Sequence, residues 1–192
     1  MRLAKLAWVA VIALTGGMLM ADGPKADSAI STAGILTDIK PKAFEAKYVM
    51  IWVDGSDGPV RFNLPEGFDQ NTFNFPPKGK GIFVPDRVQI TYKKCGDGDS
   101  VNNLLTITKS AVPATGTVTG TVLFSNDFWV AVKPKVGLMD GYAMAGQKGM
   151  GDRLKALNKG DIVTIKFHTD IERHRIDTMQ VTPGKPADSQ PK

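Results

Sequence analysis

The stretches DRVQITY at residues 86–92 and DIVTIKF at residues 161–167 share one pattern, and this pattern decides the fold. In each, an aspartate is followed by valine, isoleucine and an aromatic residue at offsets of two, four and six. Such alternation of β-branched or aromatic residues with polar ones predicts a strand that buries one face. Each stretch follows a turn-forming segment, VPD at 84–86 and KGD at 159–161, and leads into a second strand. The chain therefore contains the same β-hairpin twice.

The segments before the two hairpins continue the repeat more loosely. Three strand-like runs precede each hairpin, at 33–38, 48–53 and 60–64 in the first half and at 116–122, 128–132 and 142–144 in the second. A short helix is expected at 153–158, with Asp152 as its cap. Five strands in each half predict an all-β fold of two tandem five-stranded OB-like barrels with at most one short helix. A single continuous β-sandwich is the alternative.

The second half resembles a known group of domains. Its first strand reads GTVTGTV at 116–122, and glycines there let a long strand bend around a barrel corner. A GDIVTI strand at 160–165 and a short acidic and basic hairpin follow. In these features the segment 116–181 is similar to OB-fold-like domains of secreted bacterial proteins. The resemblance covers about a third of the chain. It implies a fold but no activity, because many such domains have none assigned.

The first residues have the order of a targeting segment. Arg2 and Lys5 precede an apolar run at 6–14, and the segment ends in the small residue Ala21. This order predicts a signal peptide, so we expect a secreted or periplasmic protein with no membrane span after cleavage. An uncleaved membrane anchor is the alternative. The expected regions are a signal peptide at 1–21, a leader at 22–33, OB-like domain 1 at 34–109, OB-like domain 2 at 116–182 and a disordered tail at 183–192.

Composition narrows the function classes. The 192 residues include 24 Lys and Arg against 19 Asp and Glu, a net charge of +5. Removal of the predicted signal peptide takes away two of the basic residues, which leaves 22 against 19, or +3. So small an excess, together with export, disfavours nucleic acid as a partner. One cysteine excludes an internal disulfide, and the composition leaves the oligomeric state open.

Two segments resemble catalytic motifs but lack essential residues. DGSDG at 54–58 has Asp54 where a nucleophile elbow needs glycine. GYAMAGQKG at 141–149 has Gln147 where a phosphate-binding loop needs lysine. We therefore expect a protein that is not an enzyme and takes no cofactor.

One segment has the spacing of a metal site. HTDIERH at 168–174 would place His168, His174 and two carboxylates on one face of an unbroken strand, a set of ligands suited to Zn²⁺. The alternation of buried residues stops at Phe167 and resumes at Ile176, so we expect a hairpin tip whose four polar side chains lie in solvent. The prediction is no metal site, with a two-histidine site as the weak alternative.

The most unusual segment is PEGFDQNTFNFPPKGKGIFV at 65–84, where an OB-fold usually has its helix. Its phenylalanines either plug the end of the barrel or form exposed stacking platforms beside lysines, which is how OB surfaces hold single strands or sugars. Trp52 and Trp129 lie in central strands and either pack in the core or contact a ligand. The candidate ligand-binding residues are Trp52, Phe68, Phe73, Phe75, Lys78, Lys80 and Trp129.

These observations predict an exported, non-enzymatic binding protein that uses its barrel faces or the insert 65–84. The expected ligand is an envelope polysaccharide, a peptide or an envelope protein. The alternative is a structural β protein of the cell envelope that takes no small ligand. Exposure of the insert separates the two, because an exposed apolar patch calls for a partner and a buried one does not.

Overall fold

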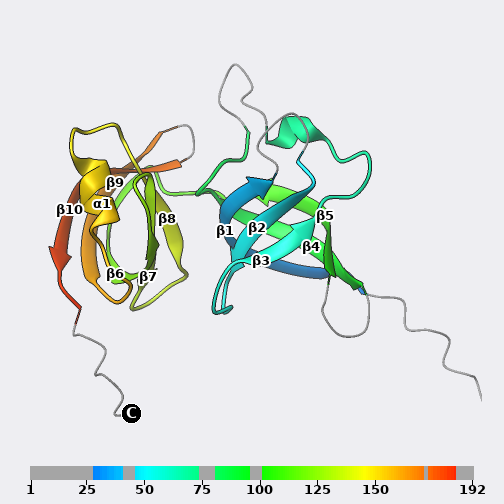
Figure 1. Ribbon diagram of the computed structural model, residues 1–192, viewed down its shortest axis with the longest axis horizontal. Helices are drawn as coiled ribbons and strands as arrows, with labels where there is room; N and C mark the ends of the chain where they lie inside the picture. Colours follow the sequence, from blue (N-terminus) through cyan, green and yellow to red (C-terminus); the bar gives the residue numbers. More distant parts are fainter. Residues whose placement is uncertain (1–27, 41–45, 74–80, 96–100, 171–172, 185–192) are drawn as a thin grey trace, which may run out of the picture.

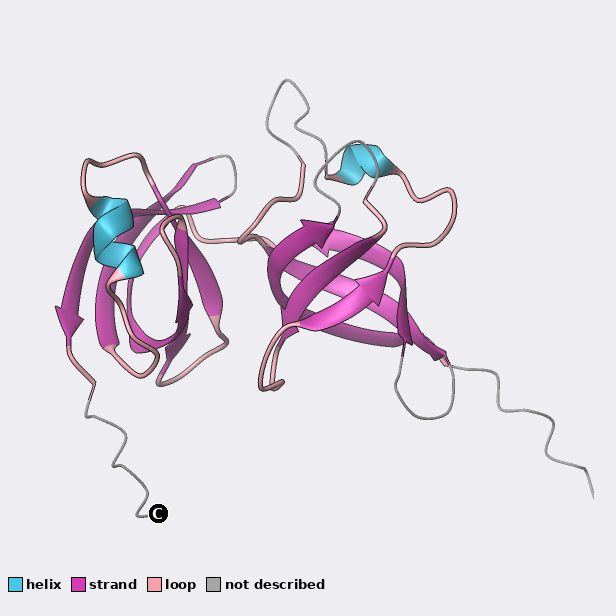
Figure 2. Ribbon diagram, viewed as in Figure 1, coloured by secondary structure: helices cyan, strands magenta, loops and turns pink. Residues whose placement is uncertain are grey.

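The computed structural model describes residues 28–40, 46–73, 81–95, 101–170 and 173–184. Within these residues the chain forms ten strands, one 3-10 turn and one short α-helix (Figures 1 and 2). The strands build two closed barrels of five strands each. The predicted all-β fold of two OB-like barrels is confirmed, and the single sandwich is wrong. The predicted signal peptide lies outside the described residues, as does the predicted tail from residue 185 onward.

The first barrel has its strands in the order β1-β2-β3-β5-β4, and β4 pairs back with β1. The elements are β1 (Ile30–Lys40), β2 (Tyr48–Val53), β3 (Val60–Asn63), the 3-10 turn η1 (Gln70–Thr72), β4 (Arg87–Cys95) and β5 (Val101–Lys109). Only the short contact of β3 with β5 is parallel. The predicted boundary at residue 34 was too late, because β1 already pairs with β4 from Ile30 onward.

The second barrel repeats this connectivity, with the strand order β10-β8-β7-β6-β9. Its elements are β6 (Thr115–Ser125), β7 (Trp129–Pro134), β8 (Asp140–Met144), the helix α1 (Met150–Lys155), β9 (Ile162–Asp170) and β10 (Arg173–Thr182). The helix starts before the predicted range because Gly149, and not Asp152, is its N-cap. It buries Met150 and Leu154 against the barrel. In the described part of the chain, no helix has the length and apolarity needed to cross a bilayer.

The aspartates of the repeated stretch have the same role in both barrels. Oδ2 of Asp86 accepts the N–H of Phe83 at 2.9 Å, and Oδ2 of Asp161 accepts the N–H of Asn158 at 2.8 Å. Each bond closes the turn that leads into the fourth strand of its barrel. Backbone hydrogen bonds from Asn158 and Gly184 hold the pKa of Asp161 below its ordinary value. The repeat in the sequence is therefore a repeat in structure.

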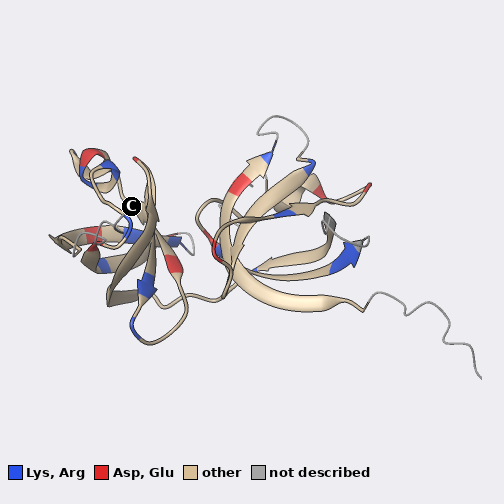
Figure 3. Ribbon diagram, turned by 60° about the horizontal axis from the view of Figure 1, so that its bottom comes forward, with Lys and Arg blue, Asp and Glu red and all other residues tan. Residues whose placement is uncertain are grey.

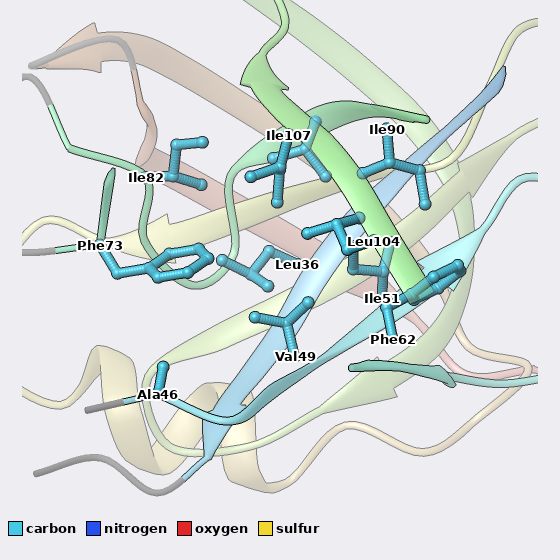
Figure 4. Packing of buried hydrophobic residues seen from close by; sticks show 11 residues of the cluster. Leu36, Ala46, Val49, Ile51, Phe62, Phe73, Ile82, Ile90, Leu104 and Ile107 are labelled. Carbon is cyan, nitrogen blue, oxygen red and sulfur yellow. The ribbon is translucent and has the colours of Figure 1, made fainter. Parts of the chain in front are cut away.

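The insert between β3 and β4 contributes to the core of the first barrel. Phe73 is 9% exposed and Ile82 is also buried, and both pack in one cluster with Leu36 (Figure 4). An apolar plug stabilises the fold because it removes the open end of the core from water. For Phe73 the plug prediction is confirmed, and this phenylalanine forms no exposed platform.

A separate apolar cluster joins the two barrels. Trp52 on β2 and Ile35 on β1 meet side chains from the second barrel, among them Trp129 on β7. The two indoles are 7% and 3% exposed. Nε1 of Trp52 donates to the carbonyl of Ser56 at 3.0 Å, so this polar group is satisfied although it is buried. The further members from the second barrel are Ala131, Met139 and Ala143.

Charged side chains also connect the barrels. Arg87 pairs with Asp54 of its own barrel and donates through Nη1 to the carbonyl of Met139 in the second, at 2.7 Å. Nε of Arg173, on β10, lies 3.0 Å from Oδ1 of Asp86 in the first barrel. Lys109 Nζ lies 2.9 Å from the other oxygen of Asp86. Asp86 is 3% exposed, and burial raises its pKa above the ordinary value although Lys109 and Arg173 oppose the shift.

The raised pKa of Asp86 predicts a pH dependence of stability. The folded chain holds the Asp86 proton more tightly than the unfolded chain does. Asp86 therefore stabilises the fold more at a pH below the pKa that it has in the unfolded chain than at a pH above the pKa that it has in the folded chain. We expect the free energy of unfolding of the wild type, minus that of Asp86→Asn, to fall as the pH rises above 3.8. Urea unfolding of both proteins at about pH 4 and about pH 7 measures this difference. A difference that grows with pH would contradict the assignment.

Candidate functional site

In OB-folds the outer face of strands two and three is a common place for ligands. The second barrel uses this face for packing against the first. Trp129, Ala131 and Ala143 lie on the outer side of β7 and β8 and are buried in the inter-barrel cluster. Gly141 stands between them on β8, where a side chain would collide with Pro85 of the first barrel. This face of the second barrel is therefore closed to a ligand.

The register of the strands identifies the matching positions in the first barrel. Both first strands have a bulge at the same place, between Leu36 and Asp38 in β1 and between Val122 and Phe124 in β6. Counted from these bulges, the pairs Tyr48–Asn63 and Met50–Arg61 of β2 and β3 correspond to Trp129–Ala143 and Ala131–Gly141 of β7 and β8. The four residues in the first barrel are exposed or half-buried. The first barrel thus leaves these four positions at least partly exposed, although Trp52, further along the same side of β2, is buried against the second barrel.

Arg61 and Tyr48 form the centre of this open face. The guanidinium carbon of Arg61 lies 4.0 Å from the centroid of the Tyr48 ring, in a cation–π contact. Nε of Arg61 donates to Oδ1 of Asn63 at 2.9 Å. The arginine is therefore oriented from two sides while it stays exposed to solvent. We call Tyr48, Met50, Arg61 and Asn63 the open face.

A groove of about 480 Å³ begins one residue beyond the Tyr48–Asn63 pair. It is lined by apolar and polar side chains from the end of β3, the start of the insert and the segment before β2, which are Ala46, Lys47, Leu64, Pro65, Glu66, Gly67, Phe68 and Gln70. Gln70 braces the groove, because its side chain accepts from the N–H of Ala46 at 2.8 Å and donates to the carbonyl of Ala46 at 3.1 Å. Its volume is in the range of small-ligand sites.

The predicted site residues fall into three groups. Trp52 and Trp129 are buried between the barrels, so the interpretation of either as a ligand contact was wrong. Phe73 is buried in the core, and Phe68 is half-buried, stacks on it at 5.5 Å between ring centroids and lines the groove. Phe75, Lys78 and Lys80 lie outside the described residues. Of the predicted residues that the structure describes, Phe68 alone contributes to the candidate site.

The two histidines do not form a joint metal site. His168, on β9, is exposed, and its Nδ1 lies 2.6 Å from Oδ1 of Asp177. His174, on β10, is buried, with Nδ1 3.2 Å from Oδ2 of Asp140 and its ring stacked on Tyr142. The two strands of the predicted hairpin end at Asp170 and resume at Arg173, but the expected exposure of His174 was wrong, because this side chain is buried inside the barrel. No cluster of three metal-ligating side chains occurs within the described residues.

A second groove, of about 320 Å³, lies on the opposite strands of the first barrel, β1, β4 and β5. Its lining is uncharged, and its hydroxyl groups bond to each other, as Ser31 and Thr91 do at 3.2 Å. Such a row of threonines is ordinary on the solvent side of a sheet. The second groove provides no charged or aromatic group to fix a ligand, so its residues are suitable positions for control substitutions.

The open face could have been suspected from the sequence. In YVMIWV at 48–53 the alternation places Val49 and Ile51 in the core of the first barrel, and Tyr48, Met50 and Trp52 on the outer side. Neither Tyr48 nor Met50 was predicted as a site residue, because alternation identifies the buried side of a strand and does not indicate what the other side binds.

Lys and Arg residues are interspersed with Asp and Glu residues over both barrels (Figure 3).

The chain matches no protein-family model, and no curated protein is similar to it in sequence.

Proposed function

We propose that this chain is an exported, non-enzymatic protein of the cell envelope that binds a polysaccharide on the open face of its first barrel. One observation carries the proposal: the outer side of β7 and β8 packs against the first barrel, whereas the equivalent positions on β2 and β3 are left at least partly exposed. In the second barrel the positions hold tryptophan, alanine and glycine and are covered. In the first they hold an oriented, exposed arginine and a half-buried tyrosine, next to a groove.

The chemistry of the open face suits a sugar. Sugars present C–H groups, which pack on aromatic rings, together with hydroxyl groups, which need hydrogen-bond partners. Tyr48 supplies a ring, Asn63 an amide, and the groove supplies both apolar side chains such as Phe68 and polar ones such as Lys47. Ligand sites of this kind combine an apolar lining with a few placed polar groups. Export, the other half of the proposal, rests on the signal-like sequence at 1–21.

Loss of the open face is expected to abolish polysaccharide binding. The chain from Asp22 to Lys192 would be run in native gels containing polysaccharide extracted from the envelope of the source organism and freed of protein by protease. We expect the wild type to be retarded and Tyr48→Ala/Arg61→Ala to migrate as in a gel without polysaccharide, since the double variant removes both the ring and the guanidinium. Gln89→Ala, in the second groove, is the control and should be retarded like the wild type.

Two results of that experiment would contradict the proposal. One is a wild-type protein whose mobility is the same with and without polysaccharide. The other is a double variant that is retarded as strongly as the wild type, while Gln89→Ala has lost its retardation.

A structural role in the envelope is the second candidate. It is favoured by apolar side chains that are exposed on loops of the second barrel, where Phe128 is 60% and Val136 is 88% exposed. Large exposed apolar residues often mark contacts with other proteins. In that case the protein would bind protease-sensitive envelope material, and substitution of Phe128 and Val136 would weaken binding while substitution of the open face would not.

A further inference from the structure

We infer that the two terminal nitrogens of Arg61 bind both oxygens of a carboxylate. The ligand of the open face is then an acidic polysaccharide, one whose sugar units carry carboxylate groups. The inference rests on the proposed function and narrows it from polysaccharides in general to a charged class. It depends on how Arg61 is held and on which partners it lacks.

Arg61 differs from the other described arginines in its partners. Each of the others donates to a carboxylate or to a backbone carbonyl, namely Arg87 to Asp54 and Met139, Arg153 to Met179, Arg173 to Asp86 and Arg175 to Met144. Arg61 donates only through Nε, and only to the amide oxygen of Asn63. Among the described residues no carboxylate lies within ion-pair distance of it, and its terminal nitrogens have no acceptor.

The contacts that Arg61 does make fix its orientation. Tyr48 lies against the flat side of the guanidinium, and Asn63 takes the Nε hydrogen. Both partners are on adjacent strands and are themselves paired across the sheet. The two terminal nitrogens are left as parallel donors, which is the geometry that binds both oxygens of a carboxylate. Because the side chain is already oriented, less conformational entropy is lost when the ligand binds.

The surroundings favour a sugar carboxylate over an acidic peptide. The lining of the groove beside Tyr48 is mixed in character, with Phe68 and Pro65 as well as Lys47 and Gln70. A chain of sugars with one carboxylate at Arg61 would lay its next unit into this groove. An acidic protein partner would need a broad basic surface, whereas basic and acidic residues are interspersed over the described strands and loops (Figure 3).

The test compares three soluble probes by titration calorimetry with the chain from Asp22 to Lys192. The probes are tetragalacturonate, its methyl ester and an octamer of glutamate. We expect tetragalacturonate to bind most tightly to the wild type and about 10- to 100-fold more weakly to Arg61→Ala, the range for loss of a charge-assisted hydrogen-bonded pair. Arg61→Lys should recover only part of the lost affinity, because an ammonium group keeps the charge but not the two parallel donors of a guanidinium. Lys166→Ala, on the second barrel, is the matched control for loss of one positive charge and should bind like the wild type.

The outcomes separate this inference from the proposed function. If the acid and its methyl ester bind equally, and Tyr48→Ala weakens both while Arg61→Ala weakens neither, a neutral polysaccharide is the ligand and the inference is overturned alone. If the glutamate octamer binds more tightly than tetragalacturonate through Arg61, the polysaccharide assignment is overturned. If neither sugar probe binds and the native gels show no retardation, both the inference and the proposed function fail.

Discussion

Replacement of Asp86 by alanine is expected to lower the free energy of unfolding by about 3–5 kcal/mol. The carboxylate is buried between Lys109 of its own barrel and Arg173 of the second, at 2.9 Å and 3.0 Å. It also accepts the N–H of Phe83. Without it, two largely buried cations lose their shared counter-ion and the turn into β4 loses its acceptor. Urea unfolding followed by tryptophan fluorescence measures the change.

Asp161→Ala is the matched control for this prediction, because Asp161 closes the equivalent turn in the second barrel without a cationic partner in the described residues. Its loss of stability should be the smaller of the two. If Asp86→Ala proves no more destabilising than Asp161→Ala, the ion pairs of Asp86 with Lys109 and Arg173 contribute nothing to stability, and the interface is not held by them.

Replacement of Trp129 by alanine is expected to have a comparable effect, about 3–5 kcal/mol. Its side chain is almost fully buried in the cluster that joins the barrels, and truncation leaves a cavity in that cluster. Because the side chain lies between the barrels and not within either, its loss should also uncouple them. We therefore expect calorimetry to show one thermal transition for the wild type and two for Trp129→Ala.

Phe128→Ala provides the control, since the neighbouring phenylalanine is exposed and its loss should change the free energy of unfolding by no more than about 0.5 kcal/mol. Equal effects of the two substitutions would mean that the inter-barrel cluster does not form in solution.

The repeated stretches at 86–92 and 161–167 were enough to predict the barrels because alternation within a strand is a local signal. Alternation shows only that one side of a strand is apolar, and it does not indicate what covers the other side. Trp52 and Trp129 were therefore ambiguous between core and ligand. Their burial depends on the contact of two units far apart in sequence, for which no pattern within one strand is evidence.

His174 shows a second limit of local patterns. Polar residues around 168–174 predicted a solvent-exposed tip, yet His174 lies inside the barrel, where Asp140 and Tyr142 hold it. Those partners come from β8, which is brought alongside β10 only by closure of the barrel. The candidate site depends on a nearer contact, since Tyr48, Arg61 and Asn63 come together when the consecutive strands β2 and β3 pair.

The central claim is that ligand occupies the open face of the first barrel. Amide ¹H–¹⁵N spectra of the chain from Asp22 to Lys192, titrated with tetragalacturonate, test it most directly. We expect the largest shifts at Tyr48, Met50, Arg61 and Asn63, and along the groove at Lys47 and Phe68. Shifts confined to the second groove around Thr91, or to the second barrel, would contradict it.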